Sequence, residues 1–151
     1  MTMTVDATLR PARGSDLPAI EQLLTTSGLP LDGVAASLNT FTVAEEGSAI
    51  VGVAGLELCG DDALLRSVAV APEWRSRGLG RMLVNHVIAE ARSRRLHGLY
   101  LLTTTAERYF PSFGFVRMDR ISVPDAVRET EEFRDACPAS AVAMGRVLRG
   151  D

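Results

Sequence analysis

The chain has 151 residues, of which 46% are hydrophobic and 23% are charged. A chain of this size and composition can bury a core without disulfides or metals, which predicts a single domain over residues 1–151 and excludes a globally disordered protein. The net charge of −3 and the pI of about 5.4 argue against nucleic acid as a partner, because binding to a phosphate backbone requires clustered positive charge.

Local patterns argue against a membrane or a metal as a partner. The longest apolar runs, such as residues 49–56, are far shorter than the about 18 residues that a membrane-spanning helix requires. Residues 1–6 show no secretory signal. Cys59 and Cys137 are too few for a metal cage and show no Cys-x-x-Cys spacing, which favours a reduced, cytoplasmic protein without a metal.

The first third of the chain predicts a strand, two helices and a strand pair. Residues 8–12 predict a short strand, and Ser15 is a suitable N-cap for a helix over residues 16–26, whose apolar residues recur at helical spacing. After a break at residues 27–30, residues 32–38 predict a second, shorter helix. Residues 41–45 and 49–58 predict an antiparallel pair of strands with a turn at residues 46–48.

Glu57 is a charged residue in the apolar run Ala54-Gly55-Leu56-Glu57-Leu58 of the second of these strands. A carboxylate in this position could accept the proton that an ammonium group must lose before it attacks as a nucleophile. It could equally be an exposed charge at the edge of the sheet. The residues alone leave both interpretations open.

Arg66 lies in a predicted strand over residues 63–70, preceded by a turn at residues 60–62. Two-residue alternation places it on one face with Leu64, Val68 and Val70, among aliphatic side chains. Burying a guanidinium group without an acidic partner is costly, so Arg66 is expected to meet a carboxylate. That carboxylate could belong to a substrate or to the protein itself.

The loop that follows this strand carries the pattern Arg75-x-x-Gly78-x-Gly80 at the start of a predicted helix over residues 79–94. Glycines without Cβ atoms let the backbone N–H groups of residues 76–80 approach an anion, and the helix N-terminus adds partial positive charge. A third glycine for a dinucleotide fingerprint is missing, and the chain has no lysine for a Walker-type loop. The pattern therefore predicts a cradle for a diphosphate.

The last third of the chain predicts three strands and two helices. Residues 99–102 predict a strand, and Thr104 with Glu107 fits a capping box, which predicts a helix that starts at Thr105. Residues 115–123 predict a strand, residues 124–133 a short acidic helical excursion, and residues 139–148 the last strand.

Three motifs in this order resemble the GNAT superfamily of N-acetyltransferases. The glycine loop resembles the family's acetyl-CoA motif, residues 9–12 and 16–20 resemble its opening, and Phe113-Gly114-Phe115 resembles its late signature. The resemblance implies an α/β (α+β) GNAT fold, with a mixed, mostly antiparallel, twisted sheet of about six to seven strands flanked by about four helices. It also implies acetyl-CoA as co-substrate and acetyl transfer to a primary amine by direct attack.

The resemblance also assigns expected roles to individual residues. Backbone groups of Val68 and Val70 would hold the pantetheine arm and polarise the thioester carbonyl. Arg66, Ser67 and Leu29 would contact the acceptor, and Glu57 would take its proton. The residues expected to bind the coenzyme are Val68, Ala69, Val70, Arg75, Ser76, Arg77, Gly78, Leu79, Gly80, Arg81, Thr103, Thr104 and Phe110.

The expected acid for the leaving thiolate departs from the family pattern. Many members place a tyrosine where this chain has Phe110, and Tyr109 is its neighbour. One residue corresponds to about 100° of a helix, so Tyr109 does not simply inherit the role. Pro111 would kink a helix and could re-aim Tyr109 toward the thiol. A thiolate that leaves without assistance is the alternative.

The segment 101–110 is similar to that of amino-acid N-acetyltransferases of the N-acetylglutamate synthase type and of small GNAT proteins associated with arsenic-resistance operons. Residues 64–70 and 137–141 add to the second likeness. This resemblance implies an acceptor that is an amino acid or an amino-acid analogue, with its carboxylate on Arg66, and a possible homodimer. A CoA-binding sensor without turnover and a protein N-terminal or lysine acetyltransferase are the alternatives.

Overall fold

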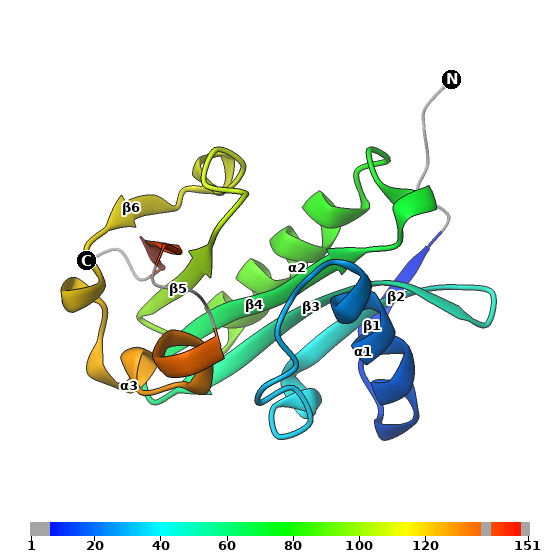
Figure 1. The fold of residues 1–151 in the computed structure, drawn as a ribbon, viewed down its shortest axis with the longest axis horizontal. Helices are drawn as coiled ribbons and strands as arrows, with labels where there is room; N and C mark the ends of the chain where they lie inside the picture. Colours follow the sequence, from blue (N-terminus) through cyan, green and yellow to red (C-terminus); the bar gives the residue numbers. More distant parts are fainter. Residues whose placement is uncertain (1–6, 137–139, 149–151) are drawn as a thin grey trace.

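The computed structural model describes residues 7–136 and 140–148, and Cys137 lies outside them. The described residues form one seven-stranded sheet with the order β1-β2-β3-β4-β5-β7-β6 (Figure 1). Every neighbouring pair is antiparallel except β4 and β5, which confirms the expected mixed, mostly antiparallel sheet. The strands are β1 Thr8–Pro11, β2 Phe41–Glu46, β3 Ala49–Cys59, β4 Asp62–Val70, β5 Gly98–Thr103, β6 Val116–Met118 and β7 Val142–Val147.

Three α-helices pack on this sheet, and Figure 1 shows α2 behind the strands with α1 and α3 in front of them. The apolar stripes of α1 and α2, predicted from helical spacing, fill the main core against β2, β3 and β4. A smaller apolar cluster lies between the sheet and α3. The helices are α1 Leu17–Thr26, α2 Leu79–Ser93 and α3 Asp125–Arg128, and a π-helical turn, Glu132–Ala136, follows α3.

Short 3-10 turns replace some of the regular structure that the residue patterns predict. Residues 32–37 form successive turns instead of a helix, because Gly33 has a left-handed φ of 79° that a right-handed helix cannot continue through. The 3-10 turns are Gly14–Asp16, Leu38–Thr40, Pro72–Trp74, Phe110–Phe113 and Arg120–Ser122. Ser15 lies inside the first of them and does not cap α1, whose N-cap is Asp16.

The predicted helix from Thr105 is wrong. Thr103, instead of Thr104, caps the following turn by accepting a hydrogen bond from Ala106 N–H (2.9 Å). Pro111 has no N–H for a helical bond to the carbonyl of Glu107, so the chain forms only the turn Phe110–Phe113. Pro111 is therefore in the first turn of a 3-10 helix and kinks nothing.

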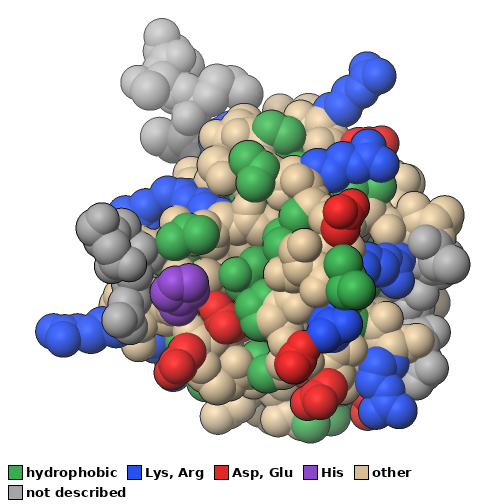
Figure 2. Space-filling view, turned by 90° about the vertical axis from the view of Figure 1, so that its left-hand side faces the viewer, with side chains coloured by type: hydrophobic (Ala, Val, Ile, Leu, Met, Phe, Trp, Pro, Cys, Tyr) green, Lys and Arg blue, Asp and Glu red, His purple; other side chains and the backbone are tan. Residues whose placement is uncertain are grey.

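The predicted strand over residues 115–123 is also shorter than expected. It pairs with β7 only over Val116–Met118, opposite Gly145, Met144 and Ala143, and then enters the turn Arg120–Ser122. Figure 2 looks onto this side of the molecule and shows apolar side chains interspersed with acidic and basic ones. The expected homodimer stays a prediction.

Among the described residues, the helices are too short or too polar to cross a membrane.

Candidate active site

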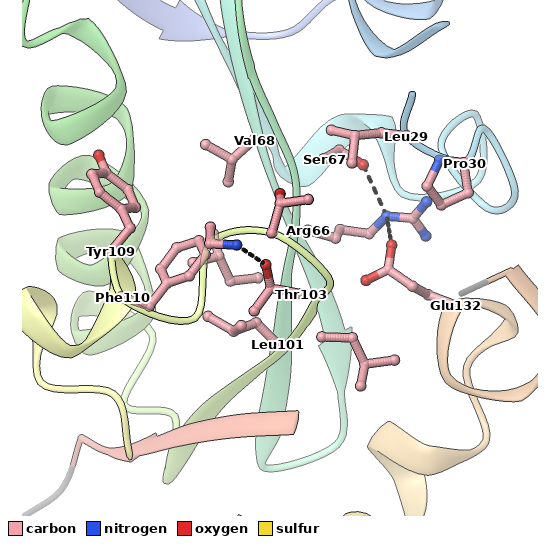
Figure 3. A pocket seen from close by; sticks show the side chains of 14 residues that line it. Leu29, Pro30, Arg66, Ser67, Val68, Leu101, Thr103, Tyr109, Phe110 and Glu132 are labelled. Carbon is pink, nitrogen blue, oxygen red and sulfur yellow. Dashed lines mark hydrogen bonds and ion pairs between the residues drawn. The ribbon is translucent and has the colours of Figure 1, made fainter. Parts of the chain in front are cut away.

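The parallel strands β4 and β5 separate halfway along their length. They pair only from Asp62–Leu64 to Gly98–Tyr100, while β4 continues to Val70 on β3 and β5 continues to Thr103 on β7. A cavity of about 210 Å³ occupies the gap between them (Figure 3). Its two strand walls are Leu65, Arg66, Ser67 and Val68 on β4 and Leu101, Leu102 and Thr103 on β5.

Loops from three other parts of the chain complete this cavity. Leu29 and Pro30 come from the connection after α1, residues 105–110 from the connection after β5, and Glu132 from the π-helical turn. Figure 3 shows Tyr109 and Glu132 at opposite ends of the row of side chains, with Arg66 beside Glu132. The cavity is therefore lined by segments that lie far apart in the sequence.

A bulge at Ser67 sets the direction of the side chains on β4. Gly55 of β3 faces Arg66, but Val53 faces Ala69, so β4 has one extra residue between these pairs. Ser67 has a φ of 58°, a left-handed conformation that costs a non-glycine residue about 1–3 kcal/mol. The predicted two-residue alternation is wrong here, since Leu64 packs in the smaller cluster while Val68 packs on the main core.

Arg66 is a fully buried guanidinium group held by acids of the protein. Its Nη1 atom lies 2.9 Å from Oε1 of Glu57, and its Nε atom lies 3.6 Å from Oε1 of Glu132 and donates a hydrogen bond to Ser67 Oγ (3.0 Å). The carboxylate that Arg66 was expected to meet is therefore supplied by the protein itself, through Glu57 and Glu132. The Nη2 atom is buried and has no hydrogen-bond partner among the described residues, which leaves a donor for an anion.

Glu132 is the acidic side chain that lines the cavity, and it is only 4% exposed. Burial raises the pKa of its carboxyl group to about 7, with Arg66 opposing the shift and Glu57 adding to it. Sequence reasoning did not single out Glu132, because nothing in the pattern of residues 124–133 distinguishes it from Glu131. Glu57, which was singled out, does not line the cavity, and its carboxylate is committed to Arg66.

A second cavity, of about 340 Å³, lies at the start of α2. Its lining includes Val70, Trp74, Arg75, Ser76, Gly78, Gly80 and Arg81. Tyr109 lines both this cavity and the one between β4 and β5, so the two adjoin at its ring. The expected diphosphate loop and the expected acceptor pocket therefore lie on either side of Tyr109.

The backbone of the glycine loop has the conformation of an anion cradle. Gly78 caps α2 with a φ of 86°, and Ser76 has a φ of 65°. The first helical hydrogen bond is donated by Met82 N–H to the carbonyl of Gly78, and no side chain caps the helix. The preceding N–H groups of α2 are therefore free for an anion, as the glycine pattern predicts.

The loop arginines make contacts that leave part of each guanidinium group exposed. Arg75 Nε donates to the carbonyl of Val70 (3.1 Å), Arg77 stacks on the ring of Trp74, and Arg81 stacks on the ring of Phe113. All three side chains are exposed. In the part of the chain that the structure describes, no acid lies at ion-pair distance from these arginines, so they add positive charge around the free N–H groups.

Tyr109 lies between the two cavities, and Phe110 is buried beside it with their rings in edge contact. A Cβ atom built on Gly80 would lie 3.4 Å from the Tyr109 hydroxyl, so this hydroxyl is next to the first turn of α2. Burial raises the pKa of Tyr109, and the positive charge of Arg81 opposes that shift. The role of Tyr109 as an acid stays a prediction.

Other predicted site residues are not all brought into the cavities. Leu29, Ser67, Val68, Thr103 and Phe110 line the cavity between β4 and β5. The side chains of Ala69 and Leu79 are buried in the main core, so only their backbone can face a ligand. Thr104 is exposed outside both cavities. Among the described residues, no three His, Cys, Asp or Glu side chains gather in a way that could hold a metal ion.

A glycine loop at a helix start beside a gap between two diverging strands is typical of proteins that hold a phosphate-bearing coenzyme, because the free N–H groups bind its phosphates. The sequence model of the Acetyltransferase (GNAT) domain family matches residues 37–117, which is more than half of the chain. The chain therefore belongs to the GNAT acetyltransferase family. This confirms the family that the three sequence motifs resemble.

Curated relatives are named amino-acid acetyltransferases. The chain is 28% identical over 150 residues to one from Mycobacterium tuberculosis, covering 93% of this chain and 83% of the relative. It is 25% identical over 138 residues to one from Pasteurella multocida, covering 85% of this chain but 31% of the relative. The chain thus spans about a third of that longer protein, and less of some others.

Solved structures show the same fold. The structure of Rv2747 from Mycobacterium tuberculosis, a complex with CoA, has a TM-score of 0.80 at 26% identity and covers 94% of this chain and 99% of that one. The N-acetylglutamate synthase from Neisseria gonorrhoeae, complexed with coenzyme A and N-acetyl-glutamate, has a TM-score of 0.82 at 22% identity. The match covers 97% of this chain and 36% of that one, and at this identity it bears on the fold alone.

Proposed function

We propose that the chain transfers the acetyl group of acetyl-CoA to the α-amine of an amino acid or a close amino-acid analogue. The observation that carries the proposal is the charged end of the cavity, where Arg66, whose Nη2 has no partner among the described residues, lies beside the carboxylate of Glu132. An α-amino acid carries its carboxylate and its ammonium on one carbon atom. Adjacent cationic and anionic groups are the partners that such a zwitterion requires.

The chain's own residues divide the work along the two cavities. The N–H groups at the start of α2 and Arg75, Arg77 and Arg81 bind the diphosphate of the coenzyme. The edge of β4 at Val68 and Val70, unpaired with β5, holds the pantetheine arm and the thioester between the two strands. Alignment of amine and thioester supplies most of the rate, because a thioester is already an activated acyl donor.

Glu57 fits a role in holding Arg66 better than its expected role as proton acceptor. Its carboxylate is paired with Nη1 of Arg66 and lies outside the cavity lining. Gly33, in the connection after α1, approaches both groups: a Cβ atom there would lie 3.0 Å from Nη1. This packing fixes the guanidinium group so that Nη2 is the atom left for an acceptor carboxylate.

The names of the curated relatives support this choice of acceptor. The resemblance to arsenic-resistance proteins adds no further argument and stays a prediction. A CoA-binding sensor without turnover is the outcome if the coenzyme binds but no acceptor releases thiol.

Release of free CoA thiol tests the proposal. Acetyl-CoA is offered with each standard amino acid, with the matching decarboxylated amines and with peptides that have free N-termini. The expected result is turnover with one or a few amino acids and at least tenfold lower kcat/KM for the matching amine, because a charged hydrogen bond to the carboxylate contributes about 1.5–3 kcal/mol. Equal rates for an amino acid and its amine would refute carboxylate recognition.

The variant Arg66→Gln checks which residue reads the carboxylate. It should lower kcat/KM for the amino acid more than for the matching amine, while the Kd for CoA stays within about twofold of the parent. Retained CoA binding shows that the variant is folded. An equal loss for both acceptors would mean that Arg66 has only a structural role in β4 and does not bind the acceptor carboxylate.

A further inference from the structure

Among the residues whose side chains the structure describes, two acidic side chains are buried, in opposite environments, and one of them lines the cavity. Asp16 is 7% exposed and accepts hydrogen bonds from both Nη atoms of Arg10 (2.8 and 2.9 Å) and from Arg13 N–H (2.7 Å). These bonds lower the pKa of Asp16 to about 2. Asp16 is a satisfied structural acid that lines neither cavity described above.

Glu132 has none of these partners. The nearest charged donor is Nε of Arg66 at 3.6 Å, which is beyond a hydrogen bond and already donates to Ser67 Oγ. No hydrogen bond to the Glu132 carboxylate is formed by the described residues. A largely buried carboxylate gains from hydrogen-bond donors, so Glu132, which lines the cavity without such a donor among the described residues, is available to a donor of the ligand.

The backbone holds Glu132 in this position by an unusual turn. The π-helical turn Glu132–Ala136 begins at this residue, and such turns are rare and frequent at functional sites. Thr130 fixes the turn, because its hydroxyl donates to the carbonyl of Val127 (2.7 Å) and accepts from Phe133 N–H (3.4 Å). Glu132 therefore points toward Arg66 from a segment that is anchored on α3 (Figure 3).

We propose that Glu132 is a catalytic residue that receives the ammonium group of the acceptor and removes its proton. This assignment rests on the proposed function and replaces Glu57 as the expected base. An ammonium nitrogen in the cavity would supply the donors that the Glu132 carboxylate lacks. Its charge would also balance the cluster, in which two acids, Glu57 and Glu132, surround a single arginine.

The proton and electron balance of the step is simple. The carboxylate of Glu132 takes one proton from the ammonium, and the free nitrogen lone pair attacks the thioester carbonyl carbon to form the C–N bond. Collapse of the tetrahedral intermediate breaks the C–S bond, and the sulfur leaves with the electron pair. The nitrogen loses a second proton as the thiolate becomes a thiol, and Glu132 returns its proton to solvent. The products are an N-acetylated acceptor, CoA and one proton.

The environment of Glu132 suits this role near neutral pH. Burial raises its pKa to about 7, close to the value that is best for a general base in this range. The charged groups that face it from the packed strands are Arg66 of β4, which opposes the shift, and Glu57 of β3, which adds to it. Bringing an ammonium beside the carboxylate adds a second cation that favours its ionised form.

The experiment compares the pH profiles of Glu132→Gln and Glu131→Gln. Glu131 is the exposed neighbour of Glu132, so its variant carries the same chemical change one residue away from the cavity. We measure kcat/KM for the best acceptor of the panel at saturating acetyl-CoA, from about pH 5.5 to about pH 9.5. The Kd for CoA, measured by calorimetry for each variant, reports on folding independently of turnover.

The parent enzyme should show kcat/KM that rises to a plateau above about pH 7, and Glu131→Gln should match it. Glu132→Gln should lose about 100-fold at about pH 7 with unchanged CoA affinity. Its kcat/KM should then rise about tenfold per pH unit toward the pKa of the amine itself, because only the pre-existing free amine can react. A purely structural ion pair would not produce this change in shape.

The outcomes separate this assignment from the proposed function. A Glu132→Gln profile with the parental shape and less than about threefold loss overturns the assignment, as does an equal loss in Glu131→Gln. If only amines without a carboxylate act as acceptors, the amino-acid proposal is refuted. The pH profiles can then be recorded with such an amine, and they still test whether Glu132 is the general base. If no amine releases thiol, both are refuted.

Discussion

Replacing Glu132 by glutamine should stabilise the fold at neutral and alkaline pH while it impairs transfer. The folded pKa of Glu132 is raised from 4.5 to about 7, so the folded protein holds this proton more tightly than the unfolded chain does. The contribution of Glu132 to stability is therefore complete below about pH 4.5 and is lost as the pH rises toward about 7. Glutamine resembles the neutral acid and cannot ionise, so its contribution to stability should not decrease as the pH rises.

The magnitude follows from the size of the shift. Each pKa unit is worth about 1.4 kcal/mol, so the ionised carboxylate of Glu132 costs the fold about 3 kcal/mol at about pH 8 and less than about 1 kcal/mol at about pH 5. For a chain of this length, the glutamine variant should melt about 5–10 °C higher than the parent at about pH 8. The attraction of Arg66 is already included in this balance.

Urea unfolding of the parent, Glu132→Gln and Glu131→Gln at several pH values measures the effect. The free energy of unfolding of Glu132→Gln minus that of the parent should grow with pH, and Glu131→Gln should show no such trend. The reasoning is refuted if Glu132→Gln is less stable than the parent at about pH 8, or if the difference is the same at about pH 5. Either result would mean that Glu132 is a favourable structural partner of Arg66.

Three other substitutions test separate parts of the structure. Tyr109→Phe should lower kcat about 100-fold with CoA affinity unchanged if its hydroxyl protonates the thiolate, and an unchanged kcat would show that the thiolate leaves unassisted. Asp16→Asn should cost about 2 kcal/mol in urea unfolding at about pH 7, because the lowered pKa of Asp16 stabilises the fold above about pH 4, and this cost should decrease as the pH falls toward about 2. Gly55→Ala should cost about 1–3 kcal/mol, because its Cβ atom would lie 2.4 Å from the buried ring of Phe41, whereas Gly14→Ala, with no atom within 4 Å, should unfold like the parent.

The sheet and the coenzyme loop could be predicted because their signals are local. Alternating apolar residues bounded by turns gave the strands, and Gly78 and Gly80 after a strand gave the helix start with free N–H groups. These features depend on residues that are neighbours in the sequence. The bounds of α2 were predictable for the same reason: the predicted helix over residues 79–94 differs from the observed one, Leu79–Ser93, by one residue.

The acceptor end of the site could not be predicted in the same way, because it depends on contacts between distant segments. The left-handed conformation of Ser67 has no sequence signature, since serine does not favour it, yet the bulge that it forms ends the alternation that was used to place Arg66. Glu132 and Arg66 are close in the structure although most of the second half of the chain separates them in the sequence. Only the folded structure shows which of several acids becomes buried.

Several costs to folding coincide at the acceptor end of the cavity. Ser67 has a strained backbone, Nη2 of Arg66 is buried without a partner among the described residues, and the largely buried carboxylate of Glu132 meets Arg66 only at 3.6 Å. A buried ion cluster of this kind is often less stable than apolar side chains of the same volume, so stability alone does not explain why it is here. Asp16 shows that this chain can satisfy a buried acid completely where no ligand is involved. The groups left unsatisfied around Arg66 are those that a bound zwitterion would complete.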